Sequence, residues 1–198
     1  MNLEIKKLTP ELTNDYIDYF ENVAFTDNHE WAGCFCTFYH WTDELEAERK
    51  VHAESDGTCF MKGQAVKFIQ NGTLQGYLAY ENGSVVGWCN VNDKANFSGR
   101  SKEKRPELWE DANTTDKVKA IVCYTIAPDM RRKGIATQLL KRICEDAVTE
   151  GYDYIEAYPG KDTNNIHRNY HGPMPLYEKF GFTLHKELEG EAVVRKYL

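Results

Sequence analysis

The clearest hydrophobic pattern in this chain lies between residues 120 and 151. Residues 120–127 form a mostly apolar run that Pro128 ends, as expected for a buried strand. After a short basic segment, apolar side chains recur at the three-to-four spacing of one helix face, namely Ile135, Leu139, Leu140, Ile143 and Ala147. Gly151 supplies a helix stop. The pattern therefore predicts a strand, a turn and a helix in succession.

Apolar spacing also predicts helices in the first 70 residues. Thr9-Pro10 is a typical helix start, with the threonine as cap, and the apolar face that follows extends to about residue 24. Thr42 begins a charged helix, and a further helix over about 60–70 ends at Asn71-Gly72.

Strand signals follow in the second half of the chain. Two β-type runs, 74–80 and 85–91, flank Asn82-Gly83, which is a strong hairpin signal. Alternating aromatic residues predict a strand over 154–158, and the segment from Phe182 onward is expected to hold two strands joined by a turn.

This order of elements favours an α/β (α+β layered) fold built around a mixed sheet. A chain of 198 residues with no visible linker is expected to be one domain, 1–198. Residues 92–117 are long and polar, which predicts either a functional lid or a disordered loop.

Charge and cysteine content narrow the classes of function. The net charge of −7 argues against nucleic-acid binding, which needs a basic face. Because the N-terminus lacks an apolar signal region and no apolar run reaches a membrane-spanning length, we expect a cytoplasmic protein without membrane contact. The 6 cysteines show no paired spacing and are expected to be reduced. Monomer and homodimer both remain open.

The basic turn before the predicted helix has the layout of an anion site. Amides in the first turn of a helix have no intrahelical partner and carry the positive end of its dipole, so they favour a phosphate together with Arg131–Lys133. Gly134 and Ala136 keep side chains out of the way. The spacing Arg131-x-x-Gly134-x-Ala136 resembles the acyl-CoA pyrophosphate loop of the GNAT superfamily of N-acyltransferases.

A second signature stands at the distance that this superfamily requires. The stretch LYEKFGF, residues 176–182, resembles the family's tyrosine-bearing helix that ends in a Gly-Phe turn before a last hairpin. The resemblance covers 118–198 closely and the preceding hairpin more loosely. It implies a mostly antiparallel central sheet flanked by helices, in which strands ending near Ala127 and Tyr158 splay apart to admit the pantetheine arm of acetyl-CoA.

The resemblance also assigns contacts with the acyl-CoA. Main-chain groups of Tyr124 and Ile126 would face the thioester, with the Ile126 N–H as oxyanion donor, and the guanidinium of Arg131 or Arg132 would assist at the pyrophosphate. Where the family often has an asparagine, seven residues before the tyrosine, this chain has Tyr170, and Asn169 is the nearest substitute. The amides expected to hold the pyrophosphate are those of Arg132, Lys133, Gly134, Ile135, Ala136 and Thr137.

Two residues are candidates for the chemistry itself. By resemblance Tyr177 would protonate the departing thiolate, although a purely structural hydroxyl is the alternative. No carboxylate lies on the strand at 120–126, so Glu156 is the best remaining general base, and its alternative is a charged residue at a strand end in water. Weaker candidates for the base are His40, His171, Glu30 or a chain of water molecules.

The sequence thus predicts an N-acetyltransferase that moves the acetyl group of acetyl-CoA directly to a primary amine of a small molecule or peptide. A non-catalytic acyl-CoA-binding or regulatory protein is the alternative. The aromatic segment Trp31–Trp41 could line the acceptor pocket or fill a satellite core. Cys34-x-Cys36 with His40 suggests a metal site, but cysteines two apart diverge, and we expect no metal.

Overall fold

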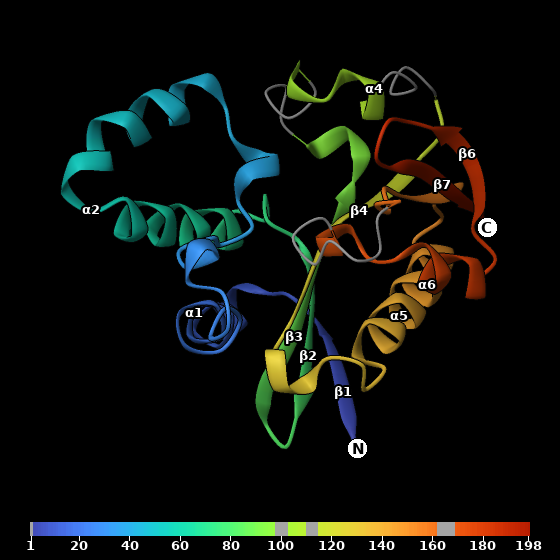
Figure 1. Ribbon diagram of the computed structural model, residues 1–198, viewed down its shortest axis with the longest axis horizontal. Helices are drawn as coiled ribbons and strands as arrows, with labels where there is room; N and C mark the ends of the chain where they lie inside the picture. Colours follow the sequence, from blue (N-terminus) through green and yellow to red (C-terminus); the bar gives the residue numbers. More distant parts are fainter. Residues whose placement is uncertain (1, 98–102, 110–114, 162–168) are drawn as a thin grey trace.

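A computed structural model describes residues 2–97, 103–109, 115–161 and 169–198, without the side chains of 53–56. Its centre is a seven-stranded sheet with the order β1-β2-β3-β4-β5-β7-β6. Only β4 and β5 are parallel, so the expected mixed, mostly antiparallel sheet is confirmed (Figure 1). The strands are β1 (Leu3–Lys7), β2 (Gly76–Glu81), β3 (Ser84–Asp93), β4 (Val118–Ile126), β5 (Tyr154–Ala157), β6 (Thr183–Glu187) and β7 (Ala192–Tyr197).

Helices cover both faces of this sheet. Figure 1 shows α1 and α2 on one side of the strands and α5 and α6 on the other. The α-helices are α1 (Thr13–Asn22), α2 (Asp43–Gln70), α4 (Pro106–Trp109), α5 (Ile135–Thr149) and α6 (Met174–Lys179). The short 3-10 turns are η1 (Pro10–Leu12), η2 (His29–Trp31), η3 (Phe38–His40), η4 (Lys94–Asn96), η5 (Pro128–Met130) and η6 (Asn169–His171).

Helix α5 agrees closely with the sequence pattern. Its buried residues are the five that the spacing places on one face. Gly134 precedes the helix in a left-handed conformation with φ +82°, and Gly151 follows it with φ +70°. Glycine adopts this conformation without the steric penalty that other residues carry. The strand, turn and helix over 118–149 therefore form as predicted.

The N-terminal half departs from the prediction at two places. The two helices expected after Thr42 are one helix of 28 residues, α2, which turns sharply midway (Figure 1). Gly57 lies within this helix and does not end it, since one internal glycine costs only about 1 kcal/mol. Strand β1 was not expected, because its pattern is interrupted by charges. It is an edge strand, paired only with β2, where polar residues are tolerated.

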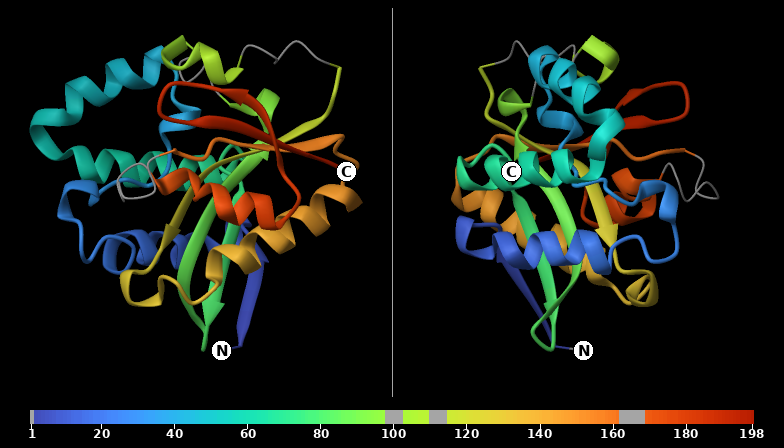
Figure 2. Two further views of the ribbon diagram at one scale, coloured as in Figure 1. Left: turned by 45° about the vertical axis from the view of Figure 1, so that its right-hand side comes forward. Right: turned by 90° about the vertical axis from the view of Figure 1, so that its left-hand side faces the viewer.

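The long polar segment 92–117 is packed where the structure describes it. Strand β3 continues to Asp93, and Phe97, Leu108 and Trp109 are buried in a second core cluster against β4 and β7. Lys186 of β6 also donates to the carbonyl of Glu107 at 3.3 Å. Figure 2 shows α4 and the β6–β7 hairpin at the same end of the molecule. These residues are therefore ordered and not a disordered loop, while the functional lid stays a prediction. Residues 98–102 and 110–114 lie outside the described part.

Two glycines are expected to respond oppositely to alanine. A Cβ at Gly76 would overlap the carbonyl oxygen of Cys89 and the indole of Trp88, whereas one at Gly63 in α2 would meet no atom within 4 Å. Gly76→Ala should lower the free energy of unfolding by about 2 kcal/mol or more through overpacking. Gly63→Ala should raise it by about 0.5–1 kcal/mol through helix propensity. Urea unfolding measures both, and equal effects would contradict the packing described at Gly76.

Candidate functional site

The two parallel strands separate halfway along β4. Their pairing runs from Val118 with Tyr154 to Ile121 with Ala157, while β4 continues to Ile126. At the same level the register with β3 shifts, because Asn90 opposes Cys123 and Val91 opposes Ile121. This leaves Val122 as an extra residue, and such a bulge bends a strand and increases its twist. The expected splay of β4 and β5 is therefore present.

Beyond the point where β4 and β5 separate, every second residue of β4 directs its main-chain N–H and C=O groups away from β3. Ala127 donates its N–H to Val86 of β3 at 3.0 Å. Because main-chain groups alternate in direction along a strand, those of Ile126 and Tyr124 point to the side where β5 is missing. Consistently, the carbonyl of Ile126 accepts from Nε of Arg131 at 3.3 Å and not from β3. We call the β5-side main chain of residues 122–126 the open edge of β4.

The short turn η6 lies beside this open edge. His171 is 4% exposed, and its Nε2 lies 3.5 Å from the hydroxyl of Tyr39. Burial lowers the pKa of His171 to about 3, so the imidazole is neutral near pH 7. The ring of Tyr170 packs on that of His171 with 4.1 Å between the centroids. Asn169 begins the same turn.

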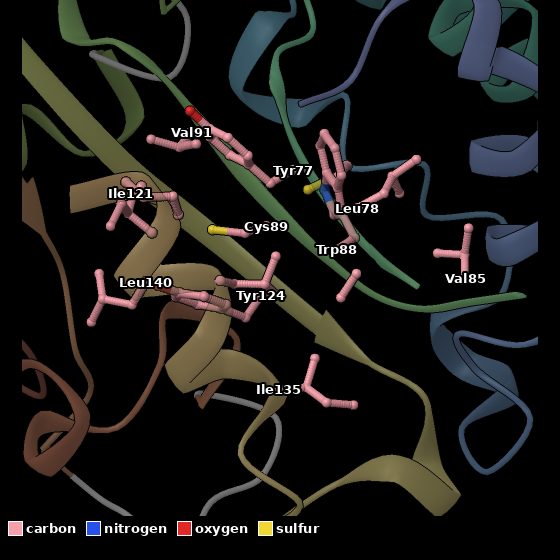
Figure 3. Packing of buried hydrophobic residues seen from close by; sticks show 14 of the residues in the cluster. Tyr77, Leu78, Val85, Trp88, Cys89, Val91, Ile121, Tyr124, Ile135 and Leu140 are labelled. Atoms are coloured by element: carbon pink, nitrogen blue, oxygen red, sulfur yellow. The ribbon is translucent and has the colours of Figure 1, made fainter. Parts of the chain in front are cut away.

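Tyr177 lies on the α5 side of the sheet and is fully buried. Its hydroxyl donates to the main-chain oxygen of His171, and the hydroxyl of Tyr124 faces it. Burial raises the pKa of Tyr177 well above its usual value, so the phenol stays protonated. Figure 3 shows Tyr124 between Cys89 of β3 and Leu140 of α5. The tyrosine predicted as acid is thus held beside β4 with its proton in place.

A cavity lies at the turn before α5. Its volume is about 410 Å³, and no atom lies within 4 Å of where a Cβ at Gly134 would stand. Lys133 and Lys179 bring two positive charges to it. Ile135 is buried in the core, so only its amide is available to a ligand. The cavity is lined by Asn2, Leu3, Lys133, Gly134, Thr137, Gln138 and Lys179.

Sequence reasoning missed four of these lining residues, namely Asn2, Leu3, Gln138 and Lys179. Gln138 follows the recognised motif, and Lys179 belongs to α6, which lies far along the chain. No local pattern indicates that α6 approaches the start of α5. Ala136, which was expected at the ligand, is partly exposed at the head of the helix.

The two arginines of the turn have different surroundings. Arg131 binds Asp27 through both terminal nitrogens, the longer of the two contacts measuring 3.1 Å. Arg132 is exposed and has φ +62°, and it makes no ion pair within the described residues. Arg132 is therefore the guanidinium that is available to a ligand, whereas Arg131 already neutralises a carboxylate.

Glu156 differs from both expectations for it. Its side chain is 0% exposed, and it lies between two cations. Oε1 accepts from Nζ of Lys94 and, at 2.7 Å, from the hydroxyl of Tyr158, while Oε2 accepts from Nε of Arg195 at 2.7 Å. A carboxylate with both oxygens occupied and no solvent contact is neither a base for an incoming amine nor a strand-end charge in water. It is the centre of a buried ion-pair network.

The remaining candidates are placed as follows. His40 is buried, which lowers its pKa to about 4, while Glu30 is exposed. Within the described residues, no group of three or more His, Cys, Asp or Glu side chains could hold a metal ion. The aromatic segment 31–41 contributes to both packing and the site's surroundings, since Trp31 contacts Tyr170 and Phe35 is buried in the main core.

Comparison with known proteins agrees with this geometry. Residues 9–182 match the model of the acetyltransferase (GNAT) family. The chain therefore belongs to the GNAT acetyltransferases, and acyl transfer is the chemistry of its class. A search of curated proteins found no match. Across the described residues, no helix combines the length and apolar character needed to cross a membrane.

Solved structures share the fold at low sequence identity. A GNAT acetyltransferase from Listeria monocytogenes aligns with a TM-score of 0.60 and 13% identity, covering 99% of this chain and 95% of the other. The PaiA N-acetyltransferase of Thermoplasma acidophilum, solved with coenzyme A, aligns with a TM-score of 0.53 and 13% identity over 100% of both chains. A polyamine N-acetyltransferase from Drosophila melanogaster aligns with a TM-score of 0.53 and 11% identity, also over 100% of both chains.

Removing the charge of Glu156 is expected to destabilise the fold. Glu156→Gln would remove the carboxylate that pairs with both Lys94 and Arg195, and breaking a buried ion pair typically costs about 3–5 kcal/mol. Glu21→Gln is the matched control, because Glu21 pairs with Lys62 at the surface and should change the free energy of unfolding by less than about 1 kcal/mol. Urea unfolding measures the free energy of unfolding of both variants. A small effect at Glu156 would mean that water reaches the network.

Proposed function

We propose that this protein is an acetyl-CoA-dependent N-acetyltransferase that transfers the acetyl group directly to a primary amine. The observation that carries the proposal is the continuity of two features along one strand. The positively lined pocket at Gly134 stands just after β4, and the open edge of that strand leads away from it. An anionic pyrophosphate and an extended thioester arm need these two features side by side.

The pyrophosphate is proposed to bind at the head of α5. The amides of residues 132–137 point out of the helix start, where the dipole favours negative charge. Lys133 and Lys179 add positive side chains around the same cavity, and the exposed Arg132 precedes Lys133 in the turn. Among the structural neighbours, the Thermoplasma acidophilum enzyme was solved with coenzyme A and the NatC complex with CoA and a Gag peptide.

The open edge supplies the groups for acyl transfer in this proposal. The N–H of Ile126 donates to the carbonyl oxygen of the thioester as negative charge develops there. Tyr177 gives its proton to the departing sulfur, exchanging its bond to the His171 carbonyl for one to the thiolate. Asn169 and Tyr170 of η6 border the same edge, on the side where the pantetheine arm is expected.

The amine loses its proton to water in this scheme. Glu156 is occupied by its ion pairs, and within the described residues β4 carries no carboxylate. An acceptor with an ordinary amine therefore reacts through the small neutral fraction present near pH 7. The acceptor itself is a small-molecule or peptide amine. A non-catalytic acyl-CoA-binding protein is the alternative, favoured by the lack of a dedicated base.

Acetyl-CoA binding tests the proposal at its first step. Wild-type protein should bind with a Kd on the order of micromolar, about −8 kcal/mol, by calorimetry. Gly134→Asp should weaken binding at least about tenfold, because the carboxylate would face the pyrophosphate. Gly134→Asn is the control, since asparagine has the same size and tolerates φ +82° but adds no charge. An absence of binding by wild-type protein would end the proposal.

Replacing Tyr177 separates catalysis from binding. Tyr177→Phe should lower turnover at least about tenfold with little change in the Kd for acetyl-CoA, since only the transferable proton is lost. Tyr124→Phe removes the neighbouring hydroxyl and serves as the control. Turnover is measured as release of the CoA thiol, with an acceptor amine found by screening polyamines, amino acids and peptides. If turnover is unchanged in Tyr177→Phe, the tyrosine has only a structural role.

A further inference from the structure

Two cysteines from distant parts of the chain meet on the α1 side of the sheet. Cys123 lies on β4 opposite Asn90, and Cys36 belongs to the segment between η2 and η3. Because Asn90 opposes Cys123 and its amide also contacts Cys36, the two cysteines are neighbours on this face. Cys36 is 5% exposed, whereas Cys123 keeps partial contact with solvent. This pair plays no part in the proposed acyl transfer.

The side chain of Asn90 holds the sulfur of Cys36. Its Nδ2 lies 3.5 Å from this sulfur and also donates to the main-chain oxygen of Cys36 at 3.0 Å. Cys123, which opposes Asn90 across the two strands, brings a second thiol to the same place. A sulfur that receives a hydrogen bond is favoured as the thiolate, which is the reactive form.

The backbone of Cys36 is strained as well. Its φ of +53° lies in the left-handed region, which few residues other than glycine adopt. The bond from Asn90 to its carbonyl holds it there. The neighbouring thiol of Cys123 and the amide of Asn90 lower the pKa of Cys36 in spite of its burial. The structure therefore keeps one activated sulfur beside a second, partly exposed one.

We propose that Cys36 and Cys123 are a redox-active dithiol that hydrogen peroxide oxidises to a disulfide. The Cys36 thiolate attacks one peroxide oxygen and breaks the O–O bond, which gives a sulfenic acid and a hydroxide that becomes water. The sulfur of Cys123 then attacks the Cys36 sulfur, and the hydroxyl leaves with the Cys123 proton as a second water. Two thiols lose two electrons and one peroxide gains them.

The disulfide joins the aromatic segment Trp31–Trp41 to β4. In the reduced protein this segment is connected to the sheet near Cys36 through hydrogen bonds from Asn90. In the oxidised protein a covalent bond fixes it to the strand whose open edge the proposed function uses. Formation of the disulfide does not depend on the proposed function. Only an effect of the disulfide on turnover would rest on that function.

Peptide mapping after oxidation tests this proposal. The protein is first given Cys34→Ser and Cys59→Ser, which removes its two exposed thiols. One equivalent of peroxide should then abolish two of the remaining four thiols and produce a Cys36–Cys123 linked peptide that dithiothreitol cleaves. No linked peptide, or a link that involves Cys89 or Cys144, would overturn the proposal. This outcome does not bear on acetyl-CoA binding, which calorimetry on the reduced protein decides.

Two asparagine variants separate activation of the sulfur from packing. Asn90→Ala should slow the reaction of Cys36 with peroxide at least about tenfold, because a donor to the thiolate is lost. Asn92→Ala is the matched control on the same strand, since Asn92 donates to the carbonyl of Thr73 at 3.1 Å. Equal rates in both variants would contradict the activation. If Asn90→Ala fails to fold, the proposal is still tested by whether the protein with Cys34→Ser and Cys59→Ser forms the linked peptide.

Discussion

The architecture of the candidate site depends on where the parallel pairing of β4 and β5 stops. Pairing ends at Ile121 and Ala157, at the level of the bulge at Val122. Main-chain groups inside a sheet normally satisfy one another, so a strand that loses its neighbour must offer its donors and acceptors elsewhere. The unpaired half of β4 is therefore a row of main-chain groups held rigidly between α1 and α5. The pocket, η6 and Tyr177 are all arranged around that row.

Much of the fold could be predicted from the sequence because its signals are local. The α5 face, the Asn82-Gly83 hairpin and the final pair of strands each have a spacing or turn chemistry that does not depend on the rest of the chain. Strand β1 could not be predicted in this way. Its polar side chains are typical of a loop, and its pairing with β2 depends on residues seventy or more positions away.

The candidate site was predictable only in part, for a related reason. The basic turn before α5 is a continuous motif, so its residues could be named from the chain. Arg131 and Glu156 were interpreted from their own positions, while their roles depend on Asp27, Lys94 and Arg195, which the fold brings in from elsewhere. A charged residue in a sequence carries no indication of whether its partner is water, a ligand or a buried counterion. The same holds for Cys36 and Cys123.

The ion pair between Arg131 and Asp27 has a consequence for how two ligands would influence each other. Asp27 follows α1 and leads into the aromatic segment, while Arg131 begins the basic turn before α5, so one contact joins these two parts of the candidate site. A ligand that shifts either partner alters the position of the other, and such linkage acts equally in both directions. Because both side chains are about a third or more exposed, their coupling is limited to about 1 kcal/mol. Binding at one half would thus change affinity at the other by a few-fold at most, a modest thermodynamic preference and not an obligatory order.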